Sequence, residues 1–379
     1  MNAIKVCILS AHRGAKPWTD LCDYLTRVKG VNFMPYLGYS DRTYRNSGTP
    51  VKRLFLRLYT FIFYPILCTA YLLFARHRHD AVIAVSSPFF LPFLCSLLSK
   101  RPVLCLHNDI YPEALYQLKL VRRGSSLSRL LERVRIINNT KCAHAVYLCE
   151  SHRRIACQVA APRSHSIIPV GSSADDFRDR PMPHEKIIRY LYCGTLGLFH
   201  NNQTLLDYIK TGQLPSDVEI DFRVSGAGAA TFAKDLVDAK ANIDPHCQIN
   251  VGPPLAHTDW MDLMSKSHVG IVSQGGQSGN VIFPSKTYTI MMAGQAVLAI
   301  ADPNSDVSAL VRDNECGWVV PPGDIEALHQ AIQASTNVDT LYRRRLNAYN
   351  YARLHFDIPV IASKWLLAIQ QTTHRQQQS

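Results

Sequence analysis

The chain has 379 residues, of which 47% are hydrophobic, and a formal net charge of +12 at pH 7. This length exceeds one ordinary hydrophobic core, so we expect two domains. Its eleven cysteines show no paired spacing, which excludes a disulfide framework and a cysteine zinc site and indicates a reducing, cytoplasmic compartment.

The first half of the chain alternates short apolar runs with helical patterns. Apolar strands separated by helices indicate a parallel sheet that is covered on both faces. We expect strands over 4–10, 80–87, 101–109, 144–150 and 165–171.

An uncharged, apolar segment covers residues 58–75, and Pro65 interrupts it. Its length is at the threshold for a membrane-spanning helix. Basic residues flank it on both sides: Lys52, Arg53, Arg57, Arg76 and Arg78. Three interpretations remain open, namely a membrane-spanning helix, a buried core helix and a helix that contacts the membrane interface.

The positive charge is concentrated in the first half. Residues 1–150 contain 21 Lys and Arg against 8 Asp and Glu, whereas the rest contains 20 against 21. A second basic, amphipathic helix is expected over 126–139. This balance suits an anionic membrane or a phosphorylated substrate, and we expect no nucleic-acid partner because no RNA-binding signature is present.

Polar residues follow the apolar run that ends at Leu106. His107, Asp109 and Glu113 are candidates for contacts to hydroxyl groups or for proton transfer, because they come directly after a strand. A surface loop in which Asp109 caps a helix and Glu113 lies in its first turn is the structural alternative.

The second half repeats the alternation of strand and helix. We expect strands over 188–195, 219–226, 247–252, 269–273, 296–300 and 317–322. The domain boundaries that follow are 1–170 for the first domain, 171–186 for a polar linker, 187–350 for the second domain and 351–379 for a final helix and tail.

Two glycine-containing loops follow strands of the second domain. Gly194, Thr195 and Gly197 come after the first strand, and Gly226 and Gly228 come after the second. Loops of this kind leave backbone N–H groups open to a phosphate, although each can also be an ordinary strand-to-helix turn. The second loop lacks the third glycine of a dinucleotide fingerprint, so NAD binding is disfavoured.

The stretch 283–294, FPSKTYTIMMAG, predicts a helix that enters at Pro284 and ends at Gly294. Asn280 lies just before it, and Ser285 is a candidate cap. A lysine in the first turn, Lys286, opposes the helix dipole unless an anion is bound there. A diphosphate satisfies this requirement, and an ordinary capped helix with an exposed lysine is the alternative.

These stretches resemble the group 1, retaining family 4 glycosyltransferases of the GT-B fold, and most closely the bacterial exopolysaccharide, O-antigen and colanic-acid type. The resemblance spans nearly the whole chain. It is carried by HNDIYPEALYQLKLVRRG at 107–124, by YCGTLGLFHNNQTLLD at 192–207 and by the run from Val281 through PPGD at 321–324.

The resemblance implies two doubly wound, Rossmann-like domains that face a cleft, with the final helix crossing back to the first domain. It implies that the second domain binds a nucleotide-sugar through Gly194, Thr195, Gly197, Gly226, Gly228, Asn280, Ser285, Lys286 and Thr289. His107 and Asp109, with Lys286, would serve catalysis, and Arg13 and Glu113 would contact the acceptor or the sugar. No cofactor and no metal ion are expected.

The chain departs from the family at two places. The family often carries two glutamates eight residues apart at this helix, and Val281, just before it, and Thr289, within it, stand at those positions. An Arg and a Lys usually follow the first strand of the second domain, and Thr195 or Leu196 and His200 or Asn201 stand there. Lys286 is therefore the principal cation expected for the diphosphate, and the ribose lacks its usual carboxylate.

The expected function is retaining, metal-independent transfer of a sugar from a nucleoside-diphosphate sugar, with a UDP-sugar favoured. The expected acceptor is a lipid-linked saccharide or polysaccharide at the inner face of the cell membrane, in bacterial surface polysaccharide synthesis. The protein would be cytoplasmic and peripherally associated with that membrane. A UDP-sugar 2-epimerase and a catalytically inactive GT-B subunit are the alternatives.

Overall fold

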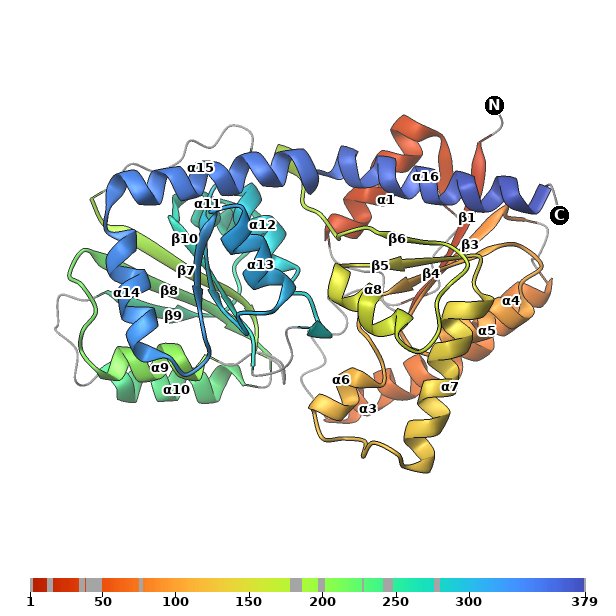
Figure 1. Ribbon diagram of the computed structural model, residues 1–379, viewed down its shortest axis with the longest axis horizontal. Helices are drawn as coiled ribbons and strands as arrows, with labels where there is room; N and C mark the ends of the chain where they lie inside the picture. The colour runs from red at the N-terminus through yellow and green to blue at the C-terminus, as the bar shows by residue number, and fades with distance from the viewer. Residues whose placement is uncertain are drawn as a thin grey trace. The chain divides into compact units, whose positions relative to one another are not determined.

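The computed structural model describes residues 3–11, 16–33, 38, 50–74, 78–177, 186–196, 202–226, 228–240, 248–275 and 280–377. Residue 50 and residues 375–377 are described by their backbone alone. The chain divides into two compact units (Figure 1). The first unit comprises Met1–Val170 together with Ile358–Ser379, and the second comprises Gly171–Asp357.

The first unit contains a six-stranded parallel sheet in the order β2-β1-β3-β4-β5-β6. This is the flavodoxin-like order with one strand added, and its topological switch point lies between β1 and β3. The strands are β1 (Ile4–Leu9), β2 (Val31–Phe33), β3 (Ala81–Val85), β4 (Val103–His107), β5 (His144–Tyr147) and β6 (His165–Ile167). The three-residue strand β2 was not predicted, because it is too short to show a periodic pattern.

Helices cover both faces of this sheet, and successive residues of β1 enter different cores. Val6 and Ile8 pack with α1 and α16, whereas Cys7 and Leu9 pack with α4 and α5. This alternation follows from the two-residue period of a strand. The helices are α1 (Lys16–Lys29), α3 (Pro50–Leu58), α4 (Tyr64–Phe74), α5 (Leu91–Leu98), α6 (Glu113–Gln117), α7 (Ser126–Lys141), α8 (Glu150–Cys157) and α16 (Ile358–Gln377).

The second unit contains a six-stranded parallel sheet in the order β12-β11-β10-β7-β8-β9. This is the Rossmann order, with its switch point between β7 and β10. The strands are β7 (Ile188–Thr195), β8 (Val218–Ser225), β9 (Ile249–Gly252), β10 (Val269–Ser273), β11 (Ala296–Ile300) and β12 (Gly317–Val320). The helices are α9 (Gln203–Lys210), α10 (Ala229–Lys240), α11 (His257–Lys266), α12 (Lys286–Met292), α13 (Asp306–Asp313), α14 (Ile325–Ser335) and α15 (Val338–His355).

The predicted fold class, two doubly wound parallel sheets with a final helix that returns to the first unit, is confirmed. The helix α16 lies along α1 (Figure 1), where Trp365 meets Trp18 edge-on with ring centroids 5.4 Å apart. The returning helix begins at Ile358 rather than at 351, because α15 continues to His355. Pro359 lies in the first turn of α16, where its missing N–H costs no helical hydrogen bond, whereas a proline within one continuous helix would interrupt it.

The first part of the expected linker 171–186 packs on the second unit instead. Ser172 donates its backbone N–H to the Phe356 carbonyl at 2.9 Å, and the Ala174 N–H donates to Asp357 at 3.0 Å. Phe177 is buried against Trp260. Backbone hydrogen bonds and the buried Phe177 thus hold residues 171–177 to the second unit in spite of their polar composition, and residues 178–185 lie outside the described part of the chain.

The apolar segment forms one continuous helical run, in which the π-helical turn η1 (Tyr59–Phe63) joins α3 to α4. Tyr64, Cys68 and Leu72 are buried in the core at helical spacing. Val51–Phe74 is also long and apolar enough to cross a membrane by length and composition. One face of the run is therefore a core face, and the other exposes large apolar side chains.

Candidate functional site

The glycine loops of the second unit meet at the carboxyl ends of β7 and β8. Thr195 and Ser225 are partners in the parallel register, and their hydroxyl oxygens lie 3.2 Å apart. Gly226 has a φ of +93°, and a Cβ there would come within 2.7 Å of the Thr195 side chain. Only glycine allows this approach, so the predicted loop residues Thr195 and Gly226 do lie together.

Gly228 and Gly194 lie in the same loop region, but they differ in whether a side chain would fit at their positions. A Cβ at Gly228 would make ordinary van der Waals contact with Leu196, so there is room for a larger residue at this position. A Cβ at Gly194 would lie 3.2 Å from the Lys286 ammonium nitrogen. Gly194 thus leaves room for the head of Lys286. Gly197 lies outside the described residues.

Lys286 is the most unusual charge in the second unit. Its ammonium nitrogen lies 3.9 Å from the centroid of the Tyr192 ring, and it has no hydrogen-bond partner among the described residues. Burial lowers the pKa of this lysine to about 8. A buried cation that faces an aromatic ring but no carboxylate is costly unless an anion is supplied.

The helix α12 that carries Lys286 is held in place by its own loop. The Pro284 carbonyl accepts hydrogen bonds from the Thr287 N–H at 3.0 Å and from the Thr287 hydroxyl at 2.7 Å. Ser285 stands at the N-cap but makes no side-chain capping bond, which corrects the expectation that it caps. Its hydroxyl is free of that role because its backbone is helical rather than extended.

Thr289 and Asn280 flank this lysine in sequence. Thr289 lies one turn further along α12 and is half-buried, and Asn280 is half-buried in the segment that leads from β10 to α12. Gln274, which did not stand out in the sequence, follows β10 and donates to the Ile282 carbonyl at 2.9 Å. Gln274 thereby fixes the segment that precedes Lys286.

His107 is packed in the core of the first unit at the end of β4. Its ring stacks on Tyr147 with centroids 5.0 Å apart, and its Nε2 lies 3.2 Å from the Cys105 sulfur. Burial lowers the pKa of His107 to about 3. The ring is therefore neutral near pH 7, which suits a hydrogen bond better than it suits proton uptake.

Asp109 lies beside His107 in the lining of a small cavity. Burial raises the pKa of the Asp109 carboxyl to about 6. The cavity has a volume of about 10 Å³, which is room for one water or hydroxyl group. Its other polar lining residues are Ser86, Tyr111, Arg135 and Asn138.

Glu113 begins α6 and forms an ion pair with Arg135 of α7. Arg135 is only 6% exposed. Glu113 Oε2, Arg135 Nε and Asn138 Oδ1 are buried without a hydrogen-bond partner in the part of the chain that the structure describes. Glu113 and Arg135 thus compensate each other's charge and leave single donor and acceptor positions open.

Arg135 and Asn138 were missed from the sequence, because 126–139 was interpreted as a basic helix that faces a membrane or solvent. Leu131, Arg135 and Asn138 are instead buried on one side of α7. Their spacing of four and three residues was the available signal. Arg13, by contrast, lies outside the described residues, so its expected contact stays a prediction.

The described residues contain no group of three or more His, Cys, Asp or Glu side chains that could hold a metal ion. The polar groups that converge on each site are a lysine and two glycine loops in the second unit, and an aspartate, a histidine and an ion pair in the first unit. Both sets follow the carboxyl ends of parallel strands, where open α/β sheets bind ligands.

Comparisons with known proteins agree with this architecture. No protein-family model matches the chain. The chain is 24% identical over 303 residues to the probable glycosyltransferase WbjE of Pseudomonas aeruginosa, covering 76% of this chain and 74% of that protein.

Two solved structures illustrate the likeness of the fold. Anabaena HepE, crystallised in complex with UDP-glucose, is 13% identical, with a TM-score of 0.70 and coverage of 97% of this chain and 100% of that one. Sucrose-phosphate synthase from Thermosynechococcus elongatus is 14% identical, with a TM-score of 0.71 and coverage of 97% and 98%. The resemblance to GT-B glycosyltransferases is therefore confirmed, and the chain has their fold.

Proposed function

We propose that the protein transfers a sugar from a nucleoside-diphosphate sugar, with UDP-sugars favoured, to a lipid-linked or polysaccharide acceptor in bacterial surface polysaccharide synthesis. The observation that carries the proposal is Lys286, a buried ammonium group without an anionic partner in the described residues. A sugar nucleotide supplies that anion as its diphosphate. The complex of HepE with UDP-glucose supports the choice of donor.

The chemistry that the second unit offers is charge stabilisation. Breaking the bond from sugar to diphosphate develops negative charge on the leaving phosphate, and a preoriented cation is worth most in a site that excludes water. Lys286 provides this charge, and the loops at Gly194 and Gly226 leave space for a ligand close to the backbone. On this proposal the reaction needs no metal ion.

The first unit contributes polar contacts to the sugar or acceptor. Its cavity is lined by a neutral His107 and by the Asp109 carboxyl, which is mostly ionised at pH 7, and the Glu113–Arg135 pair beside it is internally compensated. The site therefore has no net positive charge that would attract an anion. A neutral, hydroxyl-rich ligand matches unpaired single donors and acceptors better than an anion does. We propose transfer with retention, in which the acceptor approaches from the side of the leaving group and its proton passes to a diphosphate oxygen.

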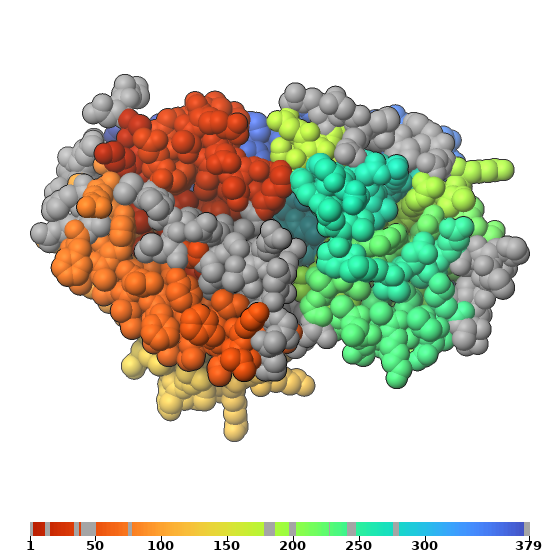
Figure 2. Space-filling model, turned by 180° about the vertical axis from the view of Figure 1, so that it is seen from behind, coloured from red at the N-terminus to blue at the C-terminus, as the bar shows by residue number. Residues whose placement is uncertain are grey.

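Association with the inner face of the cell membrane is proposed from the helical run 50–74. Figure 2 shows this segment in orange on the face turned to the viewer. Its exposed side chains combine apolar groups with Lys52, Arg53 and Arg57, a combination that suits an anionic membrane surface. The exposed apolar residues of the run are Val51, Leu54, Phe55, Leu58, Phe61, Ile62, Phe63, Ile66, Leu67, Leu73 and Phe74.

A second candidate, an inactive subunit that binds a sugar nucleotide, is favoured by one observation. Thr289 stands on α12 where the resembled family has a carboxylate. The two candidates differ in turnover but share donor binding.

A thermal-shift screen of nucleotide-sugars tests the proposal. We expect UDP and at least one UDP-sugar to raise the melting temperature of the wild type. The same ligands should leave the melting temperature of the Lys286→Met variant unchanged. Lys266→Met, an exposed lysine on α11 whose partner Asp262 lies 2.7 Å away, is the matched control and keeps the response. Stabilisation by none of the UDP- and GDP-sugars would contradict the proposal, and binding without any transfer would select the inactive subunit.

A further inference from the structure

A second basic site lies in the second unit, away from Lys286. It is a groove of about 360 Å³, and small-molecule sites typically occupy about 300–1,000 Å³. Gly317 opens β12 beneath it, whereas Gly194 lies at the carboxyl end of β7. The strands β11 and β10 lie between β12 and β7 in the sheet, so the groove is separate from the donor loops. The charged and aromatic residues that line the groove are Arg312, Glu315, Trp318, Arg343 and Arg344.

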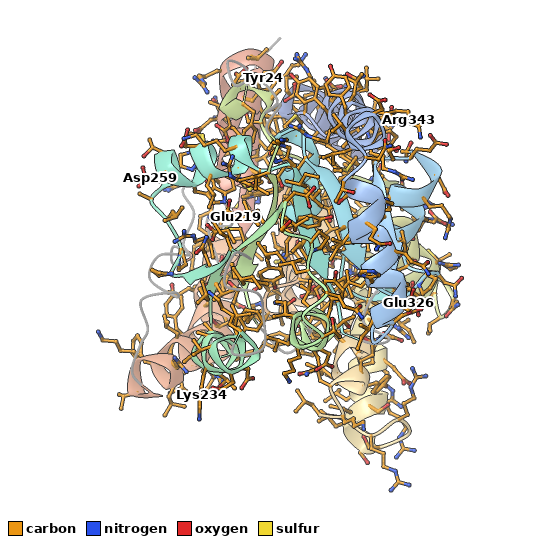
Figure 3. All side chains as sticks on the ribbon, turned by 90° about the vertical axis from the view of Figure 1, so that its left-hand side faces the viewer. Tyr24, Glu219, Lys234, Asp259, Glu326 and Arg343 are labelled. Atoms are coloured by element: carbon orange, nitrogen blue, oxygen red, sulfur yellow. The ribbon has the colours of Figure 1, made fainter. Side chains whose placement is uncertain are left out.

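The positive charges of this groove are poorly compensated. Arg343, labelled on α15 in Figure 3, is exposed, and no carboxylate of the described residues lies within 4 Å of it or of Arg344. Arg312 pairs with its neighbour Asp313 at 3.4 Å, but both side chains are exposed, so this pair is worth little. Three arginines and one glutamate leave two positive charges in the lining.

Arg344 is oriented before any ligand arrives. Its guanidinium lies over the Trp318 indole, 4.9 Å from the ring centroid, and it donates a hydrogen bond to the Gly317 carbonyl. Its Nε is buried without a partner in the described part of the chain. Burial, and then the charge of Arg343, lower the pKa of Arg344. A planar donor held in this way loses little entropy when it binds an anion.

We propose that this groove binds the phosphate group of a small phosphorylated molecule. Guanidinium groups reach it from α13 and from α15, and a tetrahedral phosphate accepts hydrogen bonds from several directions, whereas a carboxylate accepts mainly in its own plane. The two excess positive charges match a phosphate monoester, which carries a charge of about −1.5 to −2 at pH 7. The groove is larger than one phosphate, so the rest of the molecule also enters it. This inference does not depend on the proposed transferase activity.

The test uses Trp318 as a local reporter. Protein labelled with 5-fluorotryptophan gives one ¹⁹F NMR signal for each of the four tryptophans, and Trp318→Phe assigns the relevant one. The Lys286→Met background removes any response of the donor loops. We expect glucose 1-phosphate to shift the Trp318 signal in a saturable way, while the other three signals do not move.

Two arginine variants on the same helix give the matched comparison. Arg343→Gln removes a charge in the groove and weakens binding about tenfold, which corresponds to the loss of one charge-assisted hydrogen bond. Arg353→Gln removes an equivalent charge that lies over Tyr349, 5.6 Å from the ring centroid, and leaves binding unchanged. Rates of sugar transfer stay unchanged in Arg343→Gln, because Arg343 is not a residue of the donor site.

The outcomes separate clearly. The proposal is overturned if the Trp318 signal moves with neither phosphate compound. It is also overturned if the signal moves equally with sodium chloride at matched ionic strength, or if it responds equally in Arg343→Gln. Dihexanoyl phosphatidate in a parallel titration distinguishes the sources of the phosphate. A response to the lipid alone assigns the groove to a headgroup, and a response to the sugar phosphate assigns it to a free metabolite.

Discussion

The polar residues that follow β4 in the first unit and those that surround α12 in the second unit handle charge in opposite ways. Glu113 and Arg135 neutralise each other in a buried pair, and the nearby His107 is neutral. Lys286 instead faces Tyr192 and has no anionic partner in the described residues. The contrast teaches that the first site is complete without a charged ligand, whereas the second is incomplete until an anion arrives.

The largest expected effect comes from breaking the pair of the first unit. Arg135→Met leaves Glu113 buried and uncompensated, so we expect a loss of about 3–5 kcal/mol in the free energy of unfolding. Urea unfolding measures this loss. The double variant Arg135→Met with Glu113→Gln recovers part of it, because both charges are then absent. Equal losses for the double variant and for the sum of the single variants would contradict a paired arrangement.

Lys286→Met has the opposite effect on stability and a large effect on function. We expect transfer to fall about 10²–10³-fold, as for the loss of one preoriented group that stabilises developing charge. The unliganded protein gains about 1–3 kcal/mol at pH 7, because the folded pKa of about 8 lies below the ordinary value of 10.5. The cost of the lysine fades as the pH rises from about 8 to 10.5. A variant that is less stable than the wild type at pH 7 would refute an uncompensated charge.

Asp109 shares one property with Lys286, since it is a half-buried ionisable group whose pKa is shifted mainly by loss of solvent. Its folded pKa of about 6 lies above the ordinary 3.8, so its stability cost appears as the pH rises from 3.8 through about 6. Asp109→Asn is expected to stabilise the protein by about 1–2 kcal/mol at pH 7 and to leave it unchanged at pH 3. We expect the rate of sugar transfer to fall in Asp109→Asn, because the variant loses the carboxylate that is proposed to contact the sugar or the acceptor. Unfolding measured at the two pH values decides the point.

The smallest expected effect concerns the helical run 50–74. Leu67 and Leu73 are 44% and 51% exposed, and we expect their joint replacement by serine to weaken binding to anionic vesicles about tenfold. Leu354→Ser on α15, at a site that is 70% exposed, is the matched control. Co-sedimentation with vesicles measures both. Equal vesicle binding by the wild type, the double variant and the control would contradict a membrane role for this surface.

The sequence predicted most of the fold because the parallel strands are buried apolar runs with sharp ends. The strand expected over 269–273 and the strand expected over 296–300 have those bounds in the structure. The strand β2 was not predicted because three residues are too few to show an alternating pattern. Residues 171–177 were mistaken for a linker because the backbone N–H groups of Ser172 and Ala174 bond to Phe356 and Asp357, which come much later in the chain.

The candidate site was predictable only in part, for a similar reason. Lys286 stood out locally because a lysine in the first turn of a helix needs an explanation. The surroundings of its ammonium group are formed by Tyr192 and Gly194 of β7, which is distant in sequence. No local sequence pattern could therefore show that this lysine lacks an anionic partner. Arg135 was hard to predict as a buried residue, because a charged residue on a basic helix is normally exposed. Its spacing with Leu131 and Asn138 was the signal that it lies on the buried side of α7.

The central claim is that Lys286 receives the diphosphate of the donor. Calorimetric titration of UDP at pH 8, in buffers of different ionisation enthalpy, measures the protons taken up on binding. With a free pKa of about 8, Lys286 is half-protonated at this pH, and a bound diphosphate raises its pKa. We expect uptake of about half a proton for each UDP in the wild type and none in Lys286→Arg, whose charge does not titrate. Tight binding of UDP without proton uptake in the wild type would contradict the claim.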